Sequence, residues 1–179
     1  MALPSTLHRF ELGLSDVDRG VYEQLEFRIA KHPSESADFA LVRLLAYALE
    51  YEEGLEFGPG LYEATEPALS KRDMHGTIEK WVDIGAPSAD RLHKASKKAG
   101  SVVVYSHREM NHLEQDWSGK KIHQKEDIRV VLIPRKLIRA VTPSLGRTNR
   151  WDLLRTEGIL YITAGGETHE GTVEEHRIS

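Results

Sequence analysis

The chain has 179 residues, of which 40% are hydrophobic and 29% charged, so its composition is that of an ordinary globular protein. Its formal net charge is −4, which excludes a protein that binds nucleic acid through an overall positive charge and leaves only a local basic face for that task. The absence of cysteine excludes disulfides and thiolate metal sites and favours a reducing, cytoplasmic compartment, while no apolar run approaches the roughly 20 residues of a membrane helix.

The first two segments of the chain, residues 6–15 and 20–30, alternate apolar and polar residues. This period of two is typical of strands that bury one face. Residues 16–20 lie between them and supply turn-forming side chains. The pattern predicts a long N-terminal β-hairpin.

A helix is predicted after this hairpin, from Ser34 as its N-cap to about Glu53, with Gly54 ending it. Its apolar residues recur at the spacing of one helix face. They are Ala37, Ala40, Leu41, Leu44, Leu45 and Ala48.

Residues 66–85 predict a second hairpin, with its turn at 74–76 and one carboxylate on each strand, Glu66 and Asp83. This interpretation places the two carboxylates roughly opposite each other. Cross-strand partners lie about 5 Å apart at Cβ, and two carboxylates at that distance repel unless a cation or a proton separates them. A metal-dependent phosphodiesterase uses such a pair, and surface hairpins also show it by chance.

A helix over 89–99, capped by Ser88, follows this hairpin and leads into a β-branched strand at 101–106. Together with the strand before it, this predicts a right-handed βαβ crossover. Arg91, Lys94 and Lys98 form a basic face on the helix.

The remaining chain predicts helices at 108–117 and 134–141, a strand at 127–133, and terminal strands at 150–154, 159–163 and 168–173. The fold class is therefore α/β (α+β): one mixed central sheet flanked by helices, with an N-terminal hairpin and extra C-terminal strands. Residues 1–179 are expected to form a single domain.

Hydrolysis of a phosphodiester with Mg²⁺ needs oxygen ligands on rigid elements and a cation near the developing charge. The candidate metal ligands are Glu66 and Asp83, with Glu35 or Glu50 as a further oxygen; the candidate cations are Lys94 and Arg91. Zinc-binding histidine pairs, a phosphate-binding loop and a nucleophile elbow are all missing from the sequence. Trp81 shares the strand face of Asp83, where it is expected as a core aromatic rather than a stacking surface for a base.

Several motifs in this sequence resemble those of the bacterial YaeQ family, and the resemblance covers essentially the whole chain. They are MALPST at 1–6, HPSE at 32–35, RLLAYAL at 43–49, EPAL at 66–69, DMHG at 73–76, WVDIGAP at 81–87 and DRLHKA at 90–95.

The resemblance implies a variant of the restriction-endonuclease-like fold, the PD-(D/E)XK phosphodiesterase superfamily. Its αβββαβ core would occupy about residues 34–106, if 61–65 or an adjacent segment forms the first strand. Glu66 and Asp83 would take the two acidic positions of the motif. Glu66 precedes Pro67, which reverses the usual order, and Gly85 stands where the motif has lysine. Lys94 or Arg91 on the next helix would have to replace that lysine.

Two functions are therefore expected from the sequence. The first is a Mg²⁺-dependent nuclease, that is, a phosphodiester hydrolase. The second is a non-catalytic nuclease-like module that binds a nucleic acid or a cytosolic protein in a regulatory role, which Gly85 and the net charge of −4 favour. The position of Lys94 or Arg91 relative to Asp83 distinguishes them.

Overall fold

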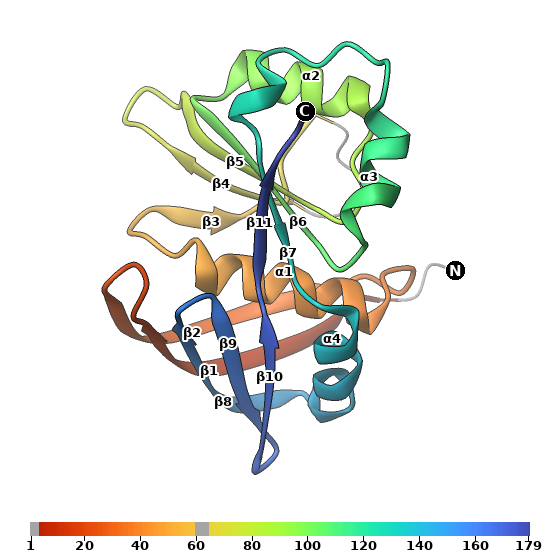
Figure 1. Ribbon diagram of the computed structural model, residues 1–179. Coiled ribbons are helices and arrows are strands. Elements are labelled where there is room, and N and C mark those ends of the chain that lie inside the picture. Colours follow the sequence, from red (N-terminus) through yellow and green to blue (C-terminus); the bar gives the residue numbers. More distant parts are fainter. Residues whose placement is uncertain (1–3, 60–64) are drawn as a thin grey trace. The chain divides into compact units, whose positions relative to one another are not determined.

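The computed structural model describes residues 4–59 and 65–179, and its elements are labelled in Figure 1. The chain divides into two compact units. Unit 1 comprises Met1–Leu44 and Ile133–Val173, and unit 2 comprises Leu45–Leu132 and Glu174–Ser179. The division falls within helix α1 (Ala37–Leu49). Among the described residues, no helix is long and apolar enough to cross a membrane.

Unit 1 contains a five-stranded sheet in the order β10-β9-β8-β1-β2. Its strands are β1 (Thr6–Asp16), β2 (Val21–Lys31), β8 (Thr148–Thr156), β9 (Ile159–Ala164) and β10 (Glu167–Thr172). The predicted N-terminal hairpin is confirmed as the antiparallel pair β1–β2, and the three predicted terminal strands are confirmed as β8 to β10. β1 also pairs in parallel with β8.

One face of this sheet is apolar and the other is polar. Phe10, Leu12 and Leu14 of β1 are buried, and the Phe10 ring meets the Trp151 ring edge-on at 5.2 Å between centroids. The residues between them point to the opposite, more exposed face, because side chains alternate along a strand. Helix α4 (Arg135–Val141) is confirmed at its predicted place and packs against β10. The contact is close at Gly171, where an added Cβ would lie 3.1 Å from the Leu137 side chain.

Unit 2 contains a second, six-stranded sheet in the order β11-β7-β6-β5-β4-β3. Its strands are β3 (Leu55–Phe57), β4 (Leu69–Arg72), β5 (Ile78–Ile84), β6 (Ser101–Ser106), β7 (Arg129–Leu132) and β11 (Glu174–Arg177). β5, β6 and β7 are parallel, so the predicted β5–α2–β6 crossover is confirmed. Residues 61–64 of the proposed first core strand lie outside the described residues, while β3 pairs with β4 instead.

The prediction of one mixed sheet is wrong, because the strands form two sheets. Alternation predicts that a segment is a strand, but it does not say which other strand accepts its hydrogen bonds. β1 pairs with β2 and β8, and neither of these pairs with the sheet that holds β5. The coarser expectation, a fold of mixed strands flanked by helices, is confirmed.

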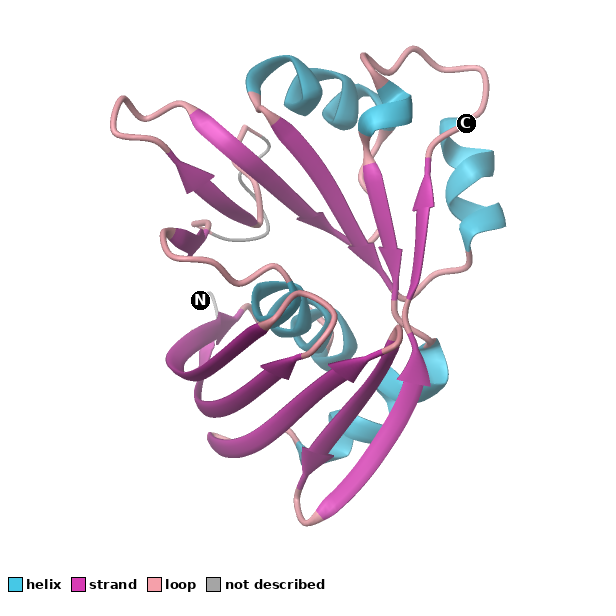
Figure 2. Ribbon diagram, turned by 60° about the vertical axis from the view of Figure 1, so that its left-hand side comes forward, coloured by secondary structure: helices cyan, strands magenta, loops and turns pink. Residues whose placement is uncertain are grey.

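The core of unit 2 lies between its sheet and the helices α2 (Ala89–Lys98) and α3 (Met110–Trp117), as the upper part of Figure 2 shows. Trp81, Val102 and Val104 from the strands meet Leu92 of α2 and Leu113 of α3 there. Two short 3-10 helices, Lys125–Asp127 in unit 2 and Thr142–Ser144 in unit 1, complete the described elements.

Candidate functional site

The predicted hairpin of residues 66–85 exists as β4 and β5, but its register differs from the expected one. Leu69 pairs with Val82 and Ser70 with Trp81. Continuing this register would place Ala68, not Glu66, level with Asp83. Glu66 lies before β4, with its side chain 40% exposed, whereas the Asp83 side chain is 3% exposed. The expectation that Glu66 and Asp83 face each other across the hairpin is therefore wrong.

Asp83 is instead bound by Arg91, which stands in the first turn of α2. The Arg91 Nε and Nη2 atoms donate to the two Asp83 carboxylate oxygens at 2.8 and 2.9 Å. Nη2 also donates to the main-chain oxygen of Glu66 at 2.6 Å. The guanidinium lies 5.5 Å from the centroid of the buried Trp81 ring, which is a core aromatic as expected. Arg91 thus joins β5, α2 and the entrance to β4.

The other two members of the predicted constellation point elsewhere. The Glu66 carboxylate accepts from Arg72 Nη2 at 2.8 Å. Lys94 pairs with Asp90, one turn earlier on the same helix, at 2.9 Å, and its side chain is 68% exposed. The structure therefore brings Arg91, but not Lys94, to Asp83. Within residues 4–59 and 65–179, no group of three or more His, Asp or Glu side chains is placed to hold a metal ion.

Glu35 belongs to unit 1 and is bound by Arg43 within the same unit. Arg43 Nε and Nη2 donate to the two oxygens of its carboxylate, each at 3.1 Å, and Nη2 also reaches the main-chain oxygen of Ala30. Glu35 additionally accepts from the main-chain N–H of His32 at 3.1 Å. These contacts tie the start of α1 to the end of β2, which is a structural role.

Glu50 belongs to unit 2, where it is 3% exposed and carries the densest set of polar contacts. Its carboxylate accepts from the Tyr105 hydroxyl at 2.6 Å and from Arg129 Nη1 at 2.9 Å, and Lys80 Nζ lies 3.5 Å away. Burial alone would raise the pKa of Glu50, but Arg129, Tyr105 and Lys80 outweigh burial and lower it.

We call this group, with Glu52, the Glu50 network: Glu50, Glu52, Lys80, Tyr105 and Arg129. Lys80 bridges the two carboxylates, with 3.0 Å between its Nζ and Glu52. Lys80 and Tyr105 point away from the core that holds α2, since their strand neighbours Trp81 and Val104 point into it. The network was not foreseen, although Lys80 and Arg129 within segments predicted as strands were a visible signal for it.

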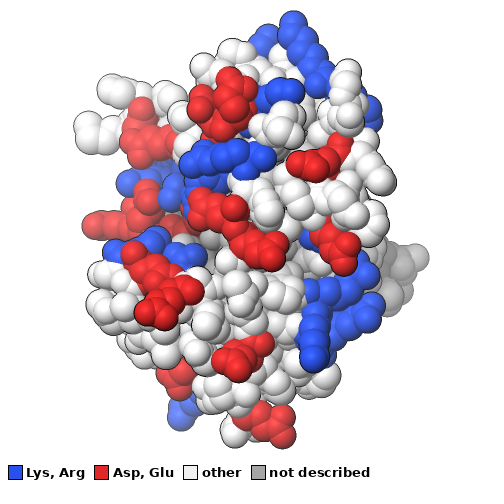
Figure 3. Space-filling model, in the orientation of Figure 1, with Lys and Arg blue, Asp and Glu red and all other residues white. Residues whose placement is uncertain are grey.

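A group of lysines and histidines lies on the exposed side of α2 and on the loop after α3. We call it the basic cluster: His93, Lys94, Lys97, Lys98, Lys121 and His123. The main-chain N–H of His123 donates to His93 Nδ1 at 3.0 Å. Partial burial lowers the pKa of His93, and the charges of Lys97 and Lys121 lower it further. Among the described residues, no carboxylate pairs with Lys97, Lys98 or Lys121. In Figure 3, Lys and Arg side chains lie along the upper edge, over α2.

Comparisons with known proteins match this chain to one family. The model of the YaeQ protein family matches residues 1–173. A protein of Escherichia coli (strain K12) described as "Uncharacterized protein YaeQ" is 26% identical over 166 residues, which cover 91% of each chain.

Two solved structures are similar over nearly their whole length. The crystal structure of YaeQ protein from Pseudomonas syringae has a TM-score of 0.85 at 32% identity, covering 99% of this chain and 98% of that one. The structure of YaeQ protein from Xanthomonas axonopodis pv. citri has a TM-score of 0.86 at 30% identity, covering 98% and 99%.

Proposed function

The chain belongs to the YaeQ family, and on that premise we propose that it is a non-catalytic module with a restriction-endonuclease-like core that binds nucleic acid through its basic cluster. The observation that carries this proposal is the ion pair of Asp83 with Arg91. Both carboxylate oxygens already accept from one guanidinium. A metal ion at Asp83 would have to compete with the positive charge of this bidentate partner, which belongs to the stronger class of ion pairs.

The order of elements supports the restriction-endonuclease-like part of the proposal. Helix α1 is followed by β3, β4 and β5, then by α2 and β6, which is the αβββαβ order that the family resemblance implies. β3, β4 and β5 are successively antiparallel, and β6 is parallel to β5. Because a fold does not fix an activity, the function still depends on the side chains.

The charge distribution supports nucleic acid as the partner. The whole chain carries −4, so phosphates would be repelled from most of its surface. Lys97, Lys98 and Lys121 are exposed, and within the described part of the chain no acidic side chain neutralises them. Clustered lysines bind phosphates by releasing condensed counterions, which makes such binding steeply dependent on salt.

The test is fluorescence anisotropy with labelled single-stranded and double-stranded DNA and RNA at two salt concentrations. The double variant Lys97→Ala/Lys121→Ala is expected to bind about tenfold or more weakly, with a reduced salt slope. The control is Arg28→Ala/Lys136→Ala in unit 1, which removes the same charge from exposed positions. Equal weakening by both double variants, or no binding by the wild type, would reject the proposal.

A second candidate function is a Mg²⁺-dependent nuclease. Glu66 and Asp83 would be its metal ligands, with Glu50 of the same unit as a further oxygen, and Arg91 or Lys94 would stabilise the phosphate. One observation favours it: Arg91 brings a cation, the Asp83 carboxylate and the Glu66 carbonyl oxygen together. The carboxylates themselves do not fit Mg²⁺ well, because those of Glu66 and Asp83 are bound to different arginines.

The nuclease candidate is tested by metal titration in a calorimeter and by cleavage of DNA and RNA with Mg²⁺ or Mn²⁺. The comparison is between wild type and Asp83→Asn, which keeps the shape of the side chain, with circular dichroism to verify folding. Cleavage by the wild type that is lost in Asp83→Asn would support catalysis. If neither protein binds metal or cleaves, catalysis is excluded.

A further inference from the structure

The exposed face of the sheet in unit 1 carries a shallow depression with a volume of about 700 Å³. Two neighbouring rows of residues form it, each crossing several strands in register. The polar row runs Thr168, Thr163, Asp152, Gly13, Gln24 across β10, β9, β8, β1 and β2. The aromatic row runs Tyr161, Leu154, Ser15, Tyr22 across β9, β8, β1 and β2.

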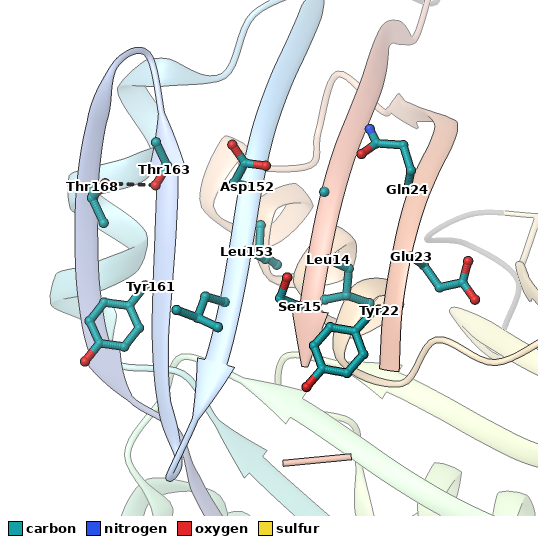
Figure 4. A pocket seen from close by; sticks show the side chains of 12 residues that line it. Leu14, Ser15, Tyr22, Glu23, Gln24, Asp152, Leu153, Tyr161, Thr163 and Thr168 are labelled. Carbon is teal, nitrogen blue, oxygen red and sulfur yellow. Dashed lines mark hydrogen bonds between the residues drawn. The ribbon is translucent and has the colours of Figure 1, made fainter. Parts of the chain in front are cut away.

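The aromatic row leaves apolar surface in contact with solvent. Tyr22 is 61% exposed and Leu154 is 38% exposed. Figure 4 shows the Tyr22 and Tyr161 rings on either side of this row, with Asp152 farther along the sheet. Strands lie about 4.8 Å apart, so the row extends across roughly 14 Å. It is therefore wide enough for several residues of a partner chain.

The Asp152 carboxylate in the polar row has no partner within the described part of the chain. Arg150, two residues earlier on the same strand face, pairs with Glu11 at 3.1 Å instead. The lining residues include no Lys or Arg. Glu23, the other acidic residue among them, pairs with the buried Leu14 and points to the opposite face of the sheet, so Asp152 supplies the negative charge here. This depression therefore favours a cation and disfavours phosphate, in contrast to the basic cluster of unit 2.

Gly13 sets the position of the Asp152 carboxylate on this face. A Cβ at Gly13 would lie 2.5 Å from Asp152 Oδ1, so the carboxylate rests over the bare backbone of β1. Glycine within a strand costs about 0.5–1 kcal/mol relative to alanine. Here the group that lies against the bare backbone is the Asp152 carboxylate itself.

We propose that this depression binds a basic segment of a protein partner. An arginine or lysine side chain matches both rows at once, because it has an apolar stem and a cationic head. The stem covers the surface of Tyr22, Leu154 and Tyr161, and the head binds the Asp152 carboxylate. Arginine fits best, since its guanidinium stacks on tyrosine rings and binds a carboxylate through two hydrogen bonds. The open, shallow shape suits a side chain of another protein better than a small molecule, which requires an enclosing pocket.

The experiment measures anisotropy of a fluorescein-labelled oligo-arginine peptide titrated with the full chain. Asp152→Asn is expected to raise Kd about tenfold, which corresponds to about 1.4 kcal/mol. Gly13→Ala is expected to raise Kd as well, because its Cβ displaces the carboxylate end of Asp152. Tyr161→Ala should weaken binding through lost stacking. The charge-matched control is Asp116→Asn, an exposed carboxylate on α3, which should leave Kd unchanged within about twofold.

Equal effects of Asp152→Asn and Asp116→Asn would show only nonspecific attraction to an acidic protein and would overturn the proposal. Binding of an oligo-glutamate peptide of the same length would overturn it too. A third outcome concerns a second copy of the chain. If the wild type forms a dimer in analytical ultracentrifugation that Tyr161→Ala abolishes, while no variant changes peptide binding, the face joins two copies and the basic-segment proposal fails.

Discussion

Glu50 is a buried carboxylate whose charge is compensated on several sides. Its oxygens accept from Tyr105 and Arg129, and Lys80 lies 3.5 Å away. Taking an ion out of water costs several kcal/mol, and this cost is offset only when the buried partners are well placed. Burial alone would lower the pKa of Arg129, but Glu50, Glu175 and Tyr105 outweigh burial and raise it. The network therefore keeps both charges in place within unit 2.

Removing the Glu50 charge should destabilise the protein strongly. Glu50→Gln removes the buried carboxylate partner of Arg129, which keeps its more exposed partner Glu175. Loss of one member of a buried pair costs about 3–5 kcal/mol. We expect the free energy of unfolding, measured by urea titration, to fall by about this amount or somewhat less. Glu53→Gln, an exposed glutamate close by in the sequence, should change it by less than about 0.5 kcal/mol. Equal effects in the two variants would contradict the assigned role.

The same carboxylate should make stability depend on acid pH. The pKa of Glu50 is lowered in the folded protein from its ordinary value of 4.5, so the unfolded chain takes up its proton first as the pH falls. The contribution of Glu50 is therefore complete above about pH 4.5 and is lost as the pH falls through the folded-state pKa. We expect the slope of unfolding free energy against pH below 4.5 to be smaller in Glu50→Gln than in wild type. Parallel slopes would mean that Glu50 does not titrate with folding.

At the scale of elements, the periodic segments were predictable and the short or aperiodic ones were not. The strands of the N-terminal hairpin and helix α2 have clear periods, and each formed as expected. β3 has three residues, and β11 reads Glu-Glu-His-Arg, which carries no apolar alternation. β11 is a strand because it hydrogen-bonds to β7, a tertiary effect that no local pattern reveals.

The candidate site was predictable only in part for the same reason. The basic face of α2 followed from its spacing, but the spacing could not tell that Arg91, rather than Lys94, meets Asp83. The hairpin register shifts at an irregularity between Lys71 and Arg72, which the turn residues did not indicate. The Glu50 network joins residues up to 79 positions apart, and such a separation leaves no local trace.

The residue that caps the N-terminus of helix α1 differs from the predicted one, and this difference can be tested. Ser34 was the predicted N-cap, but the Phe39 N–H donates to Ser36 Oγ at 3.0 Å, while Ser34 Oγ is 3.0 Å from His32 Nδ1. Losing an N-cap hydroxyl costs about 0.5–2 kcal/mol. Ser36→Ala should therefore lower the free energy of unfolding by about 1 kcal/mol, and Ser34→Ala by clearly less. A larger loss in Ser34→Ala, measured by urea unfolding, would restore the original assignment.

At the scale of the whole molecule, each compact unit is built from separate stretches of the chain. The chain passes between the units at 44–45, 132–133 and 173–174. Unit 2 therefore depends on six residues at the C-terminus, Glu174–Ser179, which follow the last residue matched by the family model. Terminal residues are usually tolerant of change unless they are tied down, and here three kinds of contact hold them.

Deleting residues 174–179 should consequently lower the stability of unit 2. β11 protects the edge of β7, Glu175 pairs with Arg129 at 2.6 Å, and Ile178 is 3% exposed in the core between the sheet and its helices. Truncating a buried isoleucine alone costs about 2–5 kcal/mol. We expect urea unfolding of the deletion variant to show at least this loss, and hydrogen exchange to quicken first at β7. Ile178→Ala should reproduce much of the effect, whereas Glu174→Gln, an exposed change in the same strand, should not. Unchanged exchange at β7 in the deletion variant would mean that β11 does not stabilise that edge.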